Sequence, residues 1–366
     1  MKFSCKTVEI VENVSNVQRA VATKSTISAL EGILIRTKND KIELCGYDLE
    51  LGIKTYIPAS IERQGCTVIN AKIFSEIVRR LPEEEVTIEV DNGQVMTIKS
   101  GKSIFSIMTI NHSDFPEIPQ IEDANTTKLP GHLLKSMIKQ TIFSISDEDV
   151  DLIHAGSLFE LEKNRINIVS VDGYRLAVRT EEIENEEELK FVVPKKTLNE
   201  IIKLIPDGED VEVIINVGKK HLLLSINEYQ IFSRLLDGEF LDYKSSIPTN
   251  ASTELIVNSK TFIESVERVA LIIIDRTKCP LRCIFSDDEI KVSCMTNIGK
   301  ATDELYAHIE GEELEIGFNS KYLLDALKNV DSEEVKIELN GSISPIKIMP
   351  KDKENLLYLI LPVRLK

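Results

Sequence analysis

The chain has 366 residues, of which 42% are hydrophobic and 28% are charged, a composition typical of globular proteins with buried cores. This length predicts two or three domains. The net charge of −16 excludes a protein that is basic throughout, but it does not exclude a local basic surface, because binding depends on where the charges lie. No stretch approaches 18 consecutive apolar residues, so we expect no membrane span.

The amino-terminal stretch MKFSCKTVEIVENV has neither a long apolar run nor a small-residue cleavage site, so we expect no signal peptide. Six cysteines lie far apart, mostly within apolar runs, and none forms a CxxC pair: Cys5, Cys45, Cys66, Cys279, Cys283 and Cys294. We therefore expect buried free thiols in a reducing cytoplasm.

The predicted elements recur in one order along the chain. Each third begins with apolar residues at three- and four-residue spacing, as in a helix with one buried face: VENVSNVQRAVA (11–22), LLKSMIKQTIFSI (133–145) and FIESVERVALII (262–273). Alternating strand patterns follow, and then a second helix motif: INAKIFSEIVRRLP (69–82), VPKKTLNEIIKLIP (193–206) and FNSKYLLDALKNVD (318–331). Further strand patterns end each third: GKSIFSIMT (101–109), YQIFSRLLD (229–237) and LLYLILPVRL (356–365).

Equivalent sequence motifs in the three thirds of the chain recur at a nearly constant spacing. The fourth residues of the helix motifs are 124 and 125 residues apart: Lys72, Lys196 and Lys321. The strand patterns between the two helices start 124 residues apart both times, at Ile42, Ile166 and Ile290. Such an interval is too long for a solenoid unit and has the length of a domain. We therefore predict three copies of one α+β domain, each with two helices packed on antiparallel sheet, over residues 1–122, 128–248 and 253–366.

The six predicted helices are basic relative to the rest of the chain. Over residues 9–20, 72–80, 131–141, 195–203, 260–268 and 320–330 they carry a net charge of +6 together, whereas everything else carries −22. Lysines that only solubilise an exposed face would explain one such helix. Six helices in equivalent positions favour a shared helical face that binds a polyanion, while the acidic remainder repels nucleic acid elsewhere.

The repeats, the stretches VDGYRLAV (171–178) and FPEIP (115–119), and the carboxyl-terminal LPVRL (361–365) together resemble one family over the whole chain. This family is the β subunit of bacterial DNA polymerase III, the sliding clamp. The resemblance implies that three like domains form a crescent and that two crescents join head to tail into a closed ring around duplex DNA. Helices would line the hole and sheets would form the outer wall. The sequence alone does not distinguish two subunits from three.

The resemblance also implies binding partners and a cellular location. The protein would be a cytoplasmic, non-catalytic processivity factor that needs no cofactor or metal. Its partners would be double-stranded DNA of any sequence, a second copy of the chain, the replicative polymerase, the clamp loader and other proteins with a clamp-binding motif.

Family positions that face DNA carry over to basic residues here: Lys24, Lys72, Arg79, Arg80 and Lys196. Lys24 falls just after the first helix motif, and the other four fall on or beside the second helix motifs. The loop SDEDVDLI (146–153) departs from the family, which often has a polar or basic residue and aromatics there.

The family has an apolar pocket that accepts short partner peptides. Its matching positions here are Val171, Gly173, Tyr174, Arg175, Leu176, Leu241, Asn319, Tyr322, Ile343, Leu359, Ile360, Leu361, Pro362, Val363 and Arg364. Aliphatic walls with a few polar groups suit an extended peptide. We expect one long apolar anchor to enter between Leu176, Ile360 and Pro362. Departures from the family at Leu241, Pro345 and His154 indicate that the preferred peptide differs.

The family's ring interface joins the first domain of one subunit to the third domain of the other. Matching positions are Lys72, Lys102 and Phe105 on one side, and Leu271, Ile272, Asp303 and Glu304 on the other. A basic and apolar surface facing an acidic and apolar one is complementary.

Sequence signatures of catalysis are missing. SGKS (100–103) resembles the end of a phosphate loop, but Met96 stands where its first glycine belongs, and strand patterns flank it on both sides. No HExxH, GxSxG or cysteine–histidine metal spacing occurs. Two readings follow: a clamp that encloses DNA without catalysis, or a repeat-built interaction scaffold that does not enclose DNA. A hydrolase is a third and weaker reading.

Overall fold

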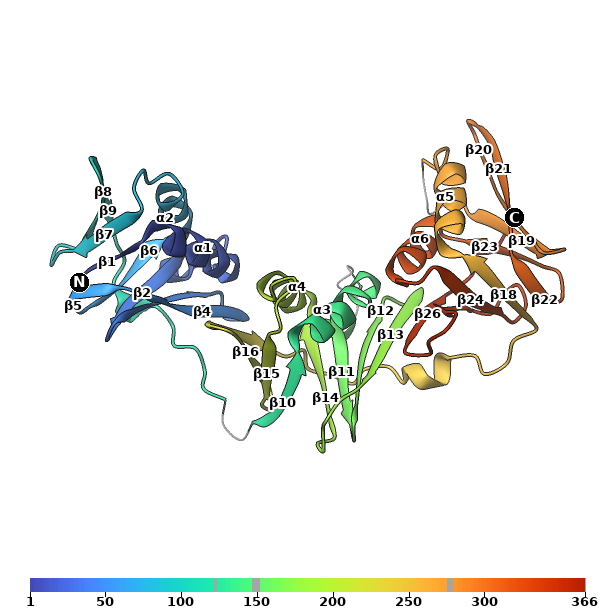
Figure 1. Ribbon diagram of the computed structural model, residues 1–366, viewed down its shortest axis with the longest axis horizontal. Helices are drawn as coiled ribbons and strands as arrows, with labels where there is room; N and C mark the ends of the chain where they lie inside the picture. Colours follow the sequence, from blue (N-terminus) through green and yellow to red (C-terminus); the bar gives the residue numbers. More distant parts are fainter. Residues whose placement is uncertain (122–123, 147–151, 275–278, 366) are drawn as a thin grey trace. The chain divides into compact units, whose positions relative to one another are not determined.

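The computed structural model describes residues 1–121, 124–146, 152–274 and 279–365 (Figure 1). Its contacts divide the chain into two compact units. Unit 1 comprises residues 1–135 and 196–235, and unit 2 comprises residues 136–195 and 236–366. The division falls within the second repeat, which therefore contributes to both units.

The described residues form six α-helices, two in each repeat: α1 Thr7–Val17, α2 Ala71–Val78, α3 Gly131–Lys139, α4 Lys195–Leu204, α5 Ser259–Ala270 and α6 Ser320–Asn329. Six helices match the number that the sequence predicted, but the first helix of each repeat begins two to four residues earlier than the apolar pattern suggested. Asparagine side chains accept a hydrogen bond from a first-turn N–H at three of these starts, which are Asn70, Asn258 and Asn319. Such caps satisfy N–H groups that the helix itself leaves without a partner.

Unit 1 contains two antiparallel sheets. The first has the order β5-β1-β7-β8-β9, with β1 Lys2–Lys6, β5 Ser60–Arg63, β7 Glu85–Val90, β8 Val95–Ser100 and β9 Ser103–Met108. The second has the order β10-β15-β16-β17-β4-β3-β2-β6. Its strands are β2 Gly32–Lys38, β3 Lys41–Tyr47, β4 Leu51–Pro58, β6 Cys66–Asn70, β10 Asn125–Pro130, β15 Glu212–Val217, β16 His221–Ile226 and β17 Tyr229–Arg234.

Unit 2 also contains two antiparallel sheets. The larger has the order β14-β11-β12-β13-β26-β25-β24-β18-β22. Its strands are β11 Gly156–Glu162, β12 Arg165–Val171, β13 Arg175–Glu182, β14 Leu189–Pro194, β18 Thr253–Asn258, β22 His308–Gly311, β24 Glu334–Leu339, β25 Ile346–Pro350 and β26 Leu356–Ile360. The smaller has the order β21-β20-β19-β23, with β19 Leu281–Ser286, β20 Glu289–Thr296, β21 Gly299–Tyr306 and β23 Leu314–Phe318.

Sheets continue across the boundaries between repeats. In unit 1, β17 of the second repeat pairs with β4 of the first, from Tyr229↔Thr55 to Ser233↔Leu51. In unit 2, β26 of the third repeat pairs with β13 of the second, from Leu356↔Arg179 to Ile360↔Arg175. The sequence suggested one sheet for each repeat. The structure instead divides each repeat's strands between two half-sheets and joins half-sheets of neighbouring repeats through main-chain hydrogen bonds.

Helices cover one face of these sheets because each has an apolar stripe. In unit 1, α1 and α2 pack on each other, and α1 packs on β3 and β4 (Figure 1). In unit 2, α5 and α6 pack together, and Phe262 and Leu323 join Val292 and Tyr358 in one buried cluster. None of the helices that the structure describes is long and apolar enough to span a membrane.

Candidate nucleic-acid, peptide and ring-closing surfaces

The basic residues predicted to face DNA are exposed but differ in their surroundings. Lys24 lies in the turn that follows α1, and Lys72 lies in the first turn of α2. Among the described residues, no acidic side chain pairs with either lysine. Arg79 and Arg80 lie just past the end of α2, where Arg79 donates a hydrogen bond to the hydroxyl of Ser15 at 3.0 Å.

Lys196 differs from the other four because its ammonium group already has an internal partner. Its Nζ donates to Oδ2 of Asp48, a carboxylate at the β3–β4 turn. The other carboxylate oxygen of Asp48 accepts hydrogen bonds from the backbone N–H groups of Glu50 and Leu51. The sequence pattern did not reveal this pair, because the two residues are 148 positions apart.

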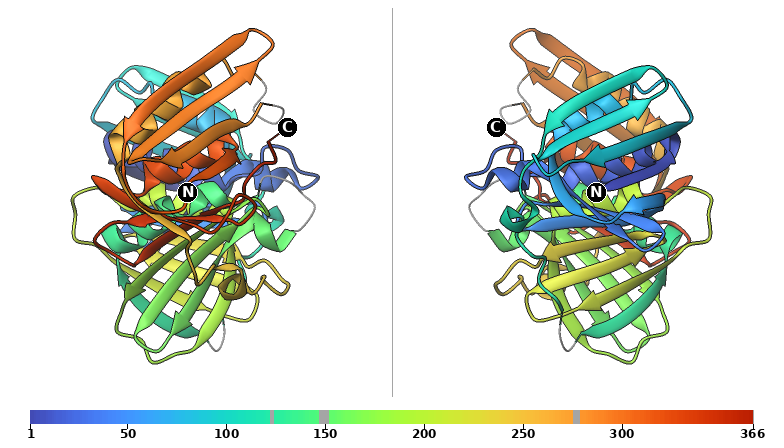
Figure 2. Two further views of the ribbon diagram at one scale, coloured as in Figure 1. Left: turned by 90° about the vertical axis from the view of Figure 1, so that its right-hand side faces the viewer. Right: turned by 90° about the vertical axis from the view of Figure 1, so that its left-hand side faces the viewer.

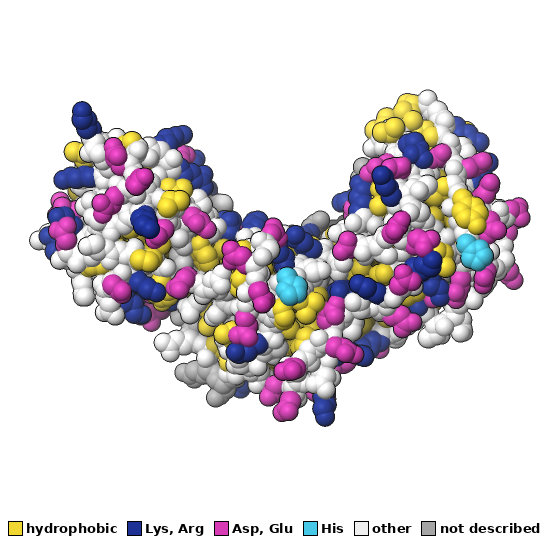
Figure 3. Space-filling view, viewed as in Figure 1, with side chains coloured by type: hydrophobic (Ala, Val, Ile, Leu, Met, Phe, Trp, Pro, Cys, Tyr) yellow, Lys and Arg dark blue, Asp and Glu magenta, His cyan; other side chains and the backbone are white. Residues whose placement is uncertain are grey.

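The helices carry less free positive charge than the sequence count suggested. Lys135 on α3 is buried, and its Nζ donates to the carbonyl of Ile205 and to Asp207. Three arginines within the predicted helix ranges lie beyond the observed helix ends: Arg19, Arg79 and Arg80. Figure 3 shows basic and acidic side chains interspersed over the face displayed. The basic character therefore belongs to particular side chains at helix starts and ends rather than to whole helices.

Buried ion pairs join neighbouring repeats beside the shared sheets. In unit 1, Arg19 lies 2.5 Å from Glu200 of α4, which also pairs with Lys203 at 2.7 Å. In unit 2, the guanidinium of Arg175 donates to Asp172, to Asp325 of α6 at 2.6 Å, and to the carbonyl of Phe143 at 2.5 Å. Glu200 and Asp325 each occupy the sixth position of their helices.

The predicted peptide pocket lies entirely within unit 2. Tyr174 and Tyr322 stack with ring centroids 6.1 Å apart, and Tyr174 is 57% exposed. The carboxyl-terminal segment runs beside them, because the N–H of Leu361 donates to the carbonyl of Tyr174 at 2.9 Å. Farther on, the N–H of Val363 donates to the carbonyl of Gly317 at 2.8 Å. Leu361 and Val363 are both partly exposed, so three distant segments present an open apolar surface together.

Other residues of the pocket set lie around this surface or beneath it. Val171, Leu176 and Leu359 belong to one buried cluster together with Tyr243 and with half-buried Phe240. Leu241 and Ile343 are exposed, Ile343 at 83%. Pro362 is half-buried, and Gly173 and Arg364 are exposed. Gly173 has φ +84°, which an L side chain rarely adopts, so the turn before Tyr174 suits glycine.

The surroundings of several residues in the pocket set decide their roles. The anchor predicted between Leu176 and Ile360 is wrong, because these residues lie on opposite faces of the sheet. Leu176 pairs with Leu359 and shares its cluster, whereas Ile360 is 1% exposed in the other core. Arg175 is buried and supports the pocket wall from below through its hydrogen bond to Asp325. The side-chain oxygen of Asn319 is used to cap α6.

The predicted ring-closing residues lie at two sheet edges. In unit 1, β9 is an edge strand that carries half-buried Phe105, and Lys102 lies in the turn before it. In unit 2, β21 is an edge strand that carries Asp303 and Glu304. Leu271 and Ile272 follow α5, and Leu271 is 83% exposed. Figure 3 shows hydrophobic side chains gathered where α5 and the β20–β21 hairpin end.

Both acids expected to attract a basic partner surface are already paired within the chain. Arg268 donates to Asp303 through two nitrogens at 2.6 and 3.0 Å, and Lys291 pairs with Glu304 at 2.5 Å. Burial opposes ionisation of Asp303, but the hydrogen bonds from Arg268 outweigh it and lower the pKa of its carboxyl. The exposed apolar residues Ile104, Met108, Ile274 and Tyr306, which the sequence analysis did not select, flank the same edges. These edges therefore expose apolar side chains, while their acidic side chains are already paired within the chain.

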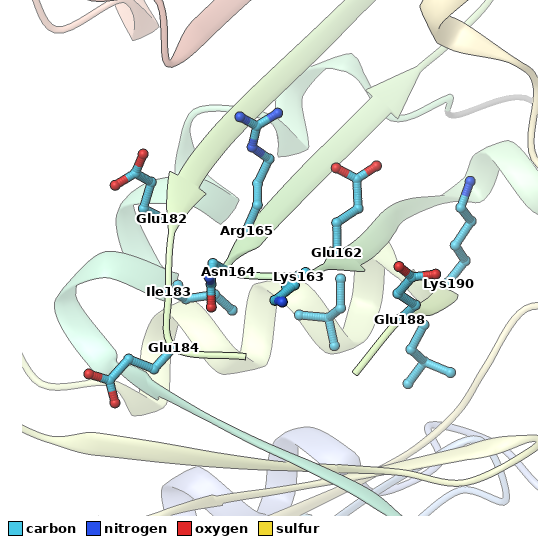
Figure 4. A pocket seen from close by; sticks show the side chains of 11 residues that line it. Glu162, Lys163, Asn164, Arg165, Glu182, Ile183, Glu184, Glu188 and Lys190 are labelled. Atoms are coloured by element: carbon cyan, nitrogen blue, oxygen red, sulfur yellow. The ribbon is translucent and has the colours of Figure 1, made fainter. Parts of the chain in front are cut away.

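A broad hollow elsewhere in unit 2 contains none of the predicted site residues (Figure 4). It is lined by the β11–β12 turn and by the connection from β13 to β14, with charges of both signs. In Figure 4, Glu182 and Glu184 point away from Glu162 and Glu188. These carboxylates therefore do not face one another as an acid–base pair would.

All six cysteines are free, and four of them are buried, as the sequence indicated. Burial raises the pKa of Cys5 and Cys45 to about 12. Such thiols stay protonated at neutral pH and are poor nucleophiles. The SGKS stretch forms the tight β8–β9 turn, with Ser100 opposite Ser103, rather than a loop that leads into a helix.

Comparisons with known proteins cover the whole chain. Family models of the DNA polymerase III beta subunit match in three parts: the N-terminal domain at residues 1–119, the central domain at 128–242 and the C-terminal domain at 244–364. The beta sliding clamp of Halalkalibacterium halodurans is 35% identical over 97% of both chains. The crystal structure of the Bacillus subtilis sliding clamp covers 100% of both chains at 34% identity, with a TM-score of 0.96. The DNA polymerase III beta subunit of Thermotoga maritima matches over the same share at 30% identity, with a TM-score of 0.93.

The repeated α+β unit, the joined sheets and these likenesses define a DNA sliding clamp, a processivity factor rather than an enzyme. The chain belongs to the DNA polymerase III beta subunit family.

Proposed function

We propose that two copies of this chain close head to tail into a ring around duplex DNA. The ring slides without sequence preference and tethers the replicative polymerase, the clamp loader and other partners through the apolar surface of unit 2. It acts in the cytoplasm, and its arc consists of three domains over residues 1–122, 128–248 and 253–366.

The observation that carries this proposal is the way in which repeats join. Both boundaries between repeats are crossed by a continuous antiparallel sheet. In the first repeat β9 is an open edge strand, and in the third repeat β21 is an open edge strand. An interface between different surfaces closes into a ring when the rotation per unit is right. A second copy supplies the neighbour that β9 and β21 each lack within one chain.

DNA enclosure is supported by the exposed basic side chains at helix ends. Lys24, Lys72, Arg79, Arg80 and Lys196 all reach solvent, and the chain as a whole carries −16. Phosphate contacts from such side chains position a protein on DNA without reading its sequence. Enclosure supplies the lasting attachment, and weak, salt-sensitive contacts then permit sliding.

Partner binding is supported by the apolar surface built from Tyr174, Tyr322, Leu361 and Val363. One buried large apolar side chain contributes about 1.5–3 kcal/mol. That energy suits partners that must exchange on one ring. We place the anchor of the peptide over Tyr174 and Leu361, on the face that carries Leu176 and Leu359.

Topological retention tests enclosure. The protein is loaded on nicked circular DNA by a bacterial clamp loader with ATP, and DNA-bound protein is separated by gel filtration. We expect retention on the circle and release after a single restriction cut. Blocking both ends of the cut DNA with bound streptavidin should restore retention. A scaffold that does not enclose DNA would remain equally bound, or equally unbound, before and after cutting.

A further inference from the structure

Two junctions between neighbouring repeats are built alike, so residues of one junction have counterparts in the other. In unit 1, β17 begins at Tyr229, which lies opposite Thr55, the fifth residue of β4. In unit 2, β26 begins at Leu356, which lies opposite Arg179, the fifth residue of β13. Leu356 is therefore the counterpart of Tyr229, and Arg179 is the counterpart of Thr55.

The helices beside these strands correspond in the same way. Helix α1 begins at Thr7 directly after β1, and α3 begins at Gly131 directly after β10. Counted from these starts, Asn16 and Gln140 are each the tenth residue. Gln140 is therefore the counterpart of Asn16.

In unit 1 a tyrosine side chain connects the sheet to the helix. The side chain of Tyr229 is partly buried, and its hydroxyl accepts a hydrogen bond from Nδ2 of Asn16 at 2.7 Å. The ring therefore reaches from the start of β17 to the last turn of α1, where its polar end has a partner. This junction shows which kind of side chain fits between two repeats of this chain.

The corresponding place in unit 2 contains a cavity of about 250 Å³. Its lining includes Leu356, Gln140 and Arg179, the counterparts of the tyrosine, of its hydrogen-bond partner and of the residue opposite it. Val330 and Pro350 extend the apolar wall that Leu356 begins. A leucine side chain is shorter than that of tyrosine and has no hydroxyl, so it leaves space that the tyrosine fills in unit 1.

The polar groups around the cavity favour a neutral ligand that donates a hydrogen bond. Arg179 and Lys353 contribute two positive charges to the lining, and Asp331 and Asp352 contribute two negative ones, so the charges balance. Oε1 of Gln140 is buried and accepts no hydrogen bond from the part of the chain that the structure describes. A buried acceptor without a partner is unfavourable, and a ligand that donates to it removes this cost.

We propose that this cavity binds a neutral hydroxyphenyl group, presented by a tyrosine side chain of a partner protein. The ring packs against Leu356 and Pro350 beside the guanidinium of Arg179, a cation that attracts aromatic rings. The hydroxyl donates to Oε1 of Gln140, in the place where unit 1 holds the hydroxyl of Tyr229.

This site is separate from the peptide surface and does not depend on ring closure. Leu356 begins β26, whereas Leu361 and Val363 of the peptide surface follow the end of that strand, toward the terminus marked C in Figure 2. The cavity opens instead beside the β25–β26 turn, where Asp352 and Lys353 are exposed. A partner could therefore occupy the cavity while a peptide lies on the apolar surface.

Methyl-detected NMR of the full chain tests the site with p-cresol, which is the tyrosine side chain as a free molecule. Titration of p-cresol should shift the methyl signals of Val330 and Leu356 saturably. Gln140→Leu keeps the shape of the side chain but removes the acceptor, so it should weaken p-cresol binding about five- to tenfold. Absence of saturable shifts in the parent chain would overturn the site, and an unchanged affinity in Gln140→Leu would overturn the assigned hydrogen bond.

Exchanging the two counterparts provides matched variants with opposite outcomes. Leu356→Tyr supplies a ring from the chain itself and should abolish p-cresol binding, whereas Leu356→Met keeps an aliphatic side chain and should retain it. Tyr229→Leu should create a second p-cresol site, in unit 1, with shifts of methyl groups there. Circular dichroism checks that each variant folds. If folded Leu356→Tyr bound p-cresol as the parent does, the cavity would not be the binding site.

A short neutral peptide separates the two sources of a hydroxyphenyl group. Acetyl-Gly-Tyr-Gly-amide should shift the same methyl signals as p-cresol, and acetyl-Gly-Leu-Gly-amide should not. Binding of p-cresol without binding of the tyrosine peptide would overturn the partner tyrosine and leave a site for small phenols. Equal binding of the two peptides would overturn the preference for a hydroxyphenyl group.

Discussion

Buried charged side chains in this protein hold neighbouring segments together through hydrogen bonds and ion pairs. The carboxylate of Glu160 on β11 is 1% exposed and accepts hydrogen bonds from Asn167 and from the hydroxyl of Tyr243. Lys190 and Lys244 also pair with it, at 2.7 and 3.2 Å. Tyr243 and Lys244 belong to the segment that leads from the second repeat to the third. Glu160 therefore ties this segment to the sheet. A buried carboxylate is tolerated only with such a set of partners.

Glu160→Gln should destabilise the protein in a pH-dependent way. Burial alone would raise the pKa of Glu160, but the hydrogen bonds from Lys190, Tyr243, Lys244 and Asn167 lower it to about 2. Because the folded-state pKa lies below the ordinary value, the ionised group stabilises the fold above about pH 4.5, and this contribution disappears as the pH falls toward 2. The loss in Glu160→Gln should be on the order of 3 kcal/mol at pH 7 and much smaller at pH 3. Urea unfolding at both pH values measures it.

Glu162→Gln is the matched control. Glu162 pairs with the same Lys244 at 2.8 Å but lies at the surface. Surface ion pairs contribute about 0–1 kcal/mol, so this variant should unfold nearly as the parent does at both pH values. If both variants lost the same free energy of unfolding, the stabilising role assigned to buried Glu160 would be wrong.

Helices and terminal segments set where basic and apolar groups are presented. The start and end of α2 present Lys72, Arg79 and Arg80, whereas Lys196 at the start of α4 is engaged by Asp48. The same residue type at equivalent positions therefore differs in its readiness to contact phosphate.

Alanine substitutions should separate these roles through the salt dependence of DNA binding. Each phosphate contact adds about 0.9 to the slope of log K against log salt concentration. The triple variant Lys24→Ala, Arg79→Ala and Arg80→Ala should therefore lower this slope by up to about 3. Lys196→Ala should change this slope by clearly less than the value of about 0.9 expected for one phosphate contact. Fluorescence anisotropy with a short duplex at several salt concentrations measures the slope, and circular dichroism checks that the variants fold. An equal change per residue would show that the Asp48 pair opens on DNA.

The carboxyl-terminal segment should be needed for peptide binding but not for dimer formation. Deleting residues 361–366 removes the hydrogen bonds from Leu361 to Tyr174 and from Val363 to Gly317, together with two exposed apolar side chains. Losing about 1.5–3 kcal/mol of apolar contact corresponds to a decrease in affinity of roughly 10- to 150-fold. Fluorescence polarisation with a labelled carboxyl-terminal peptide of the replicative polymerase measures this decrease.

Two full-length variants control for damage to the fold. Tyr174→Ala should also weaken peptide binding, whereas Val8→Asp on α1 should not, although Val8 is similarly exposed. Unchanged affinity in both the deletion and Tyr174→Ala would move the peptide site elsewhere.

At the scale of the whole molecule, the proposed ring closure would use surfaces that a single chain leaves uncovered. Changing Leu271 and Ile272 together to aspartate should convert the dimer to monomer. Burying two unpaired carboxylates is strongly unfavourable, and the neighbouring acid Asp303 already has its partner in Arg268. Light scattering at micromolar concentration measures the mass. If the double variant had the mass of the parent dimer, the residues after α5 would not belong to the interface between the two copies. Met295→Asp, an exposed residue on the β20–β21 hairpin, tests whether charge on that hairpin has the same effect.

The sequence was sufficient to predict the fold class and six helices, because these follow from local periodicity. The helix motif at 318–331 predicts α6, and Asn319 within it caps that helix in the structure. A resemblance of short motifs in one order was enough to indicate the family. Such features depend on residues close together in the chain, and a local pattern records them.

The tertiary structure alone decided how distant segments combine. It joined β17 to β4 and β26 to β13, and it placed Leu176 and Ile360 on opposite faces of one sheet. It also paired Lys196 with Asp48 and Asp303 with Arg268, which changes how much charge each surface can offer. Strand pairing and ion pairing act between residues far apart in the chain, so periodicity in the sequence carries no record of which partners meet.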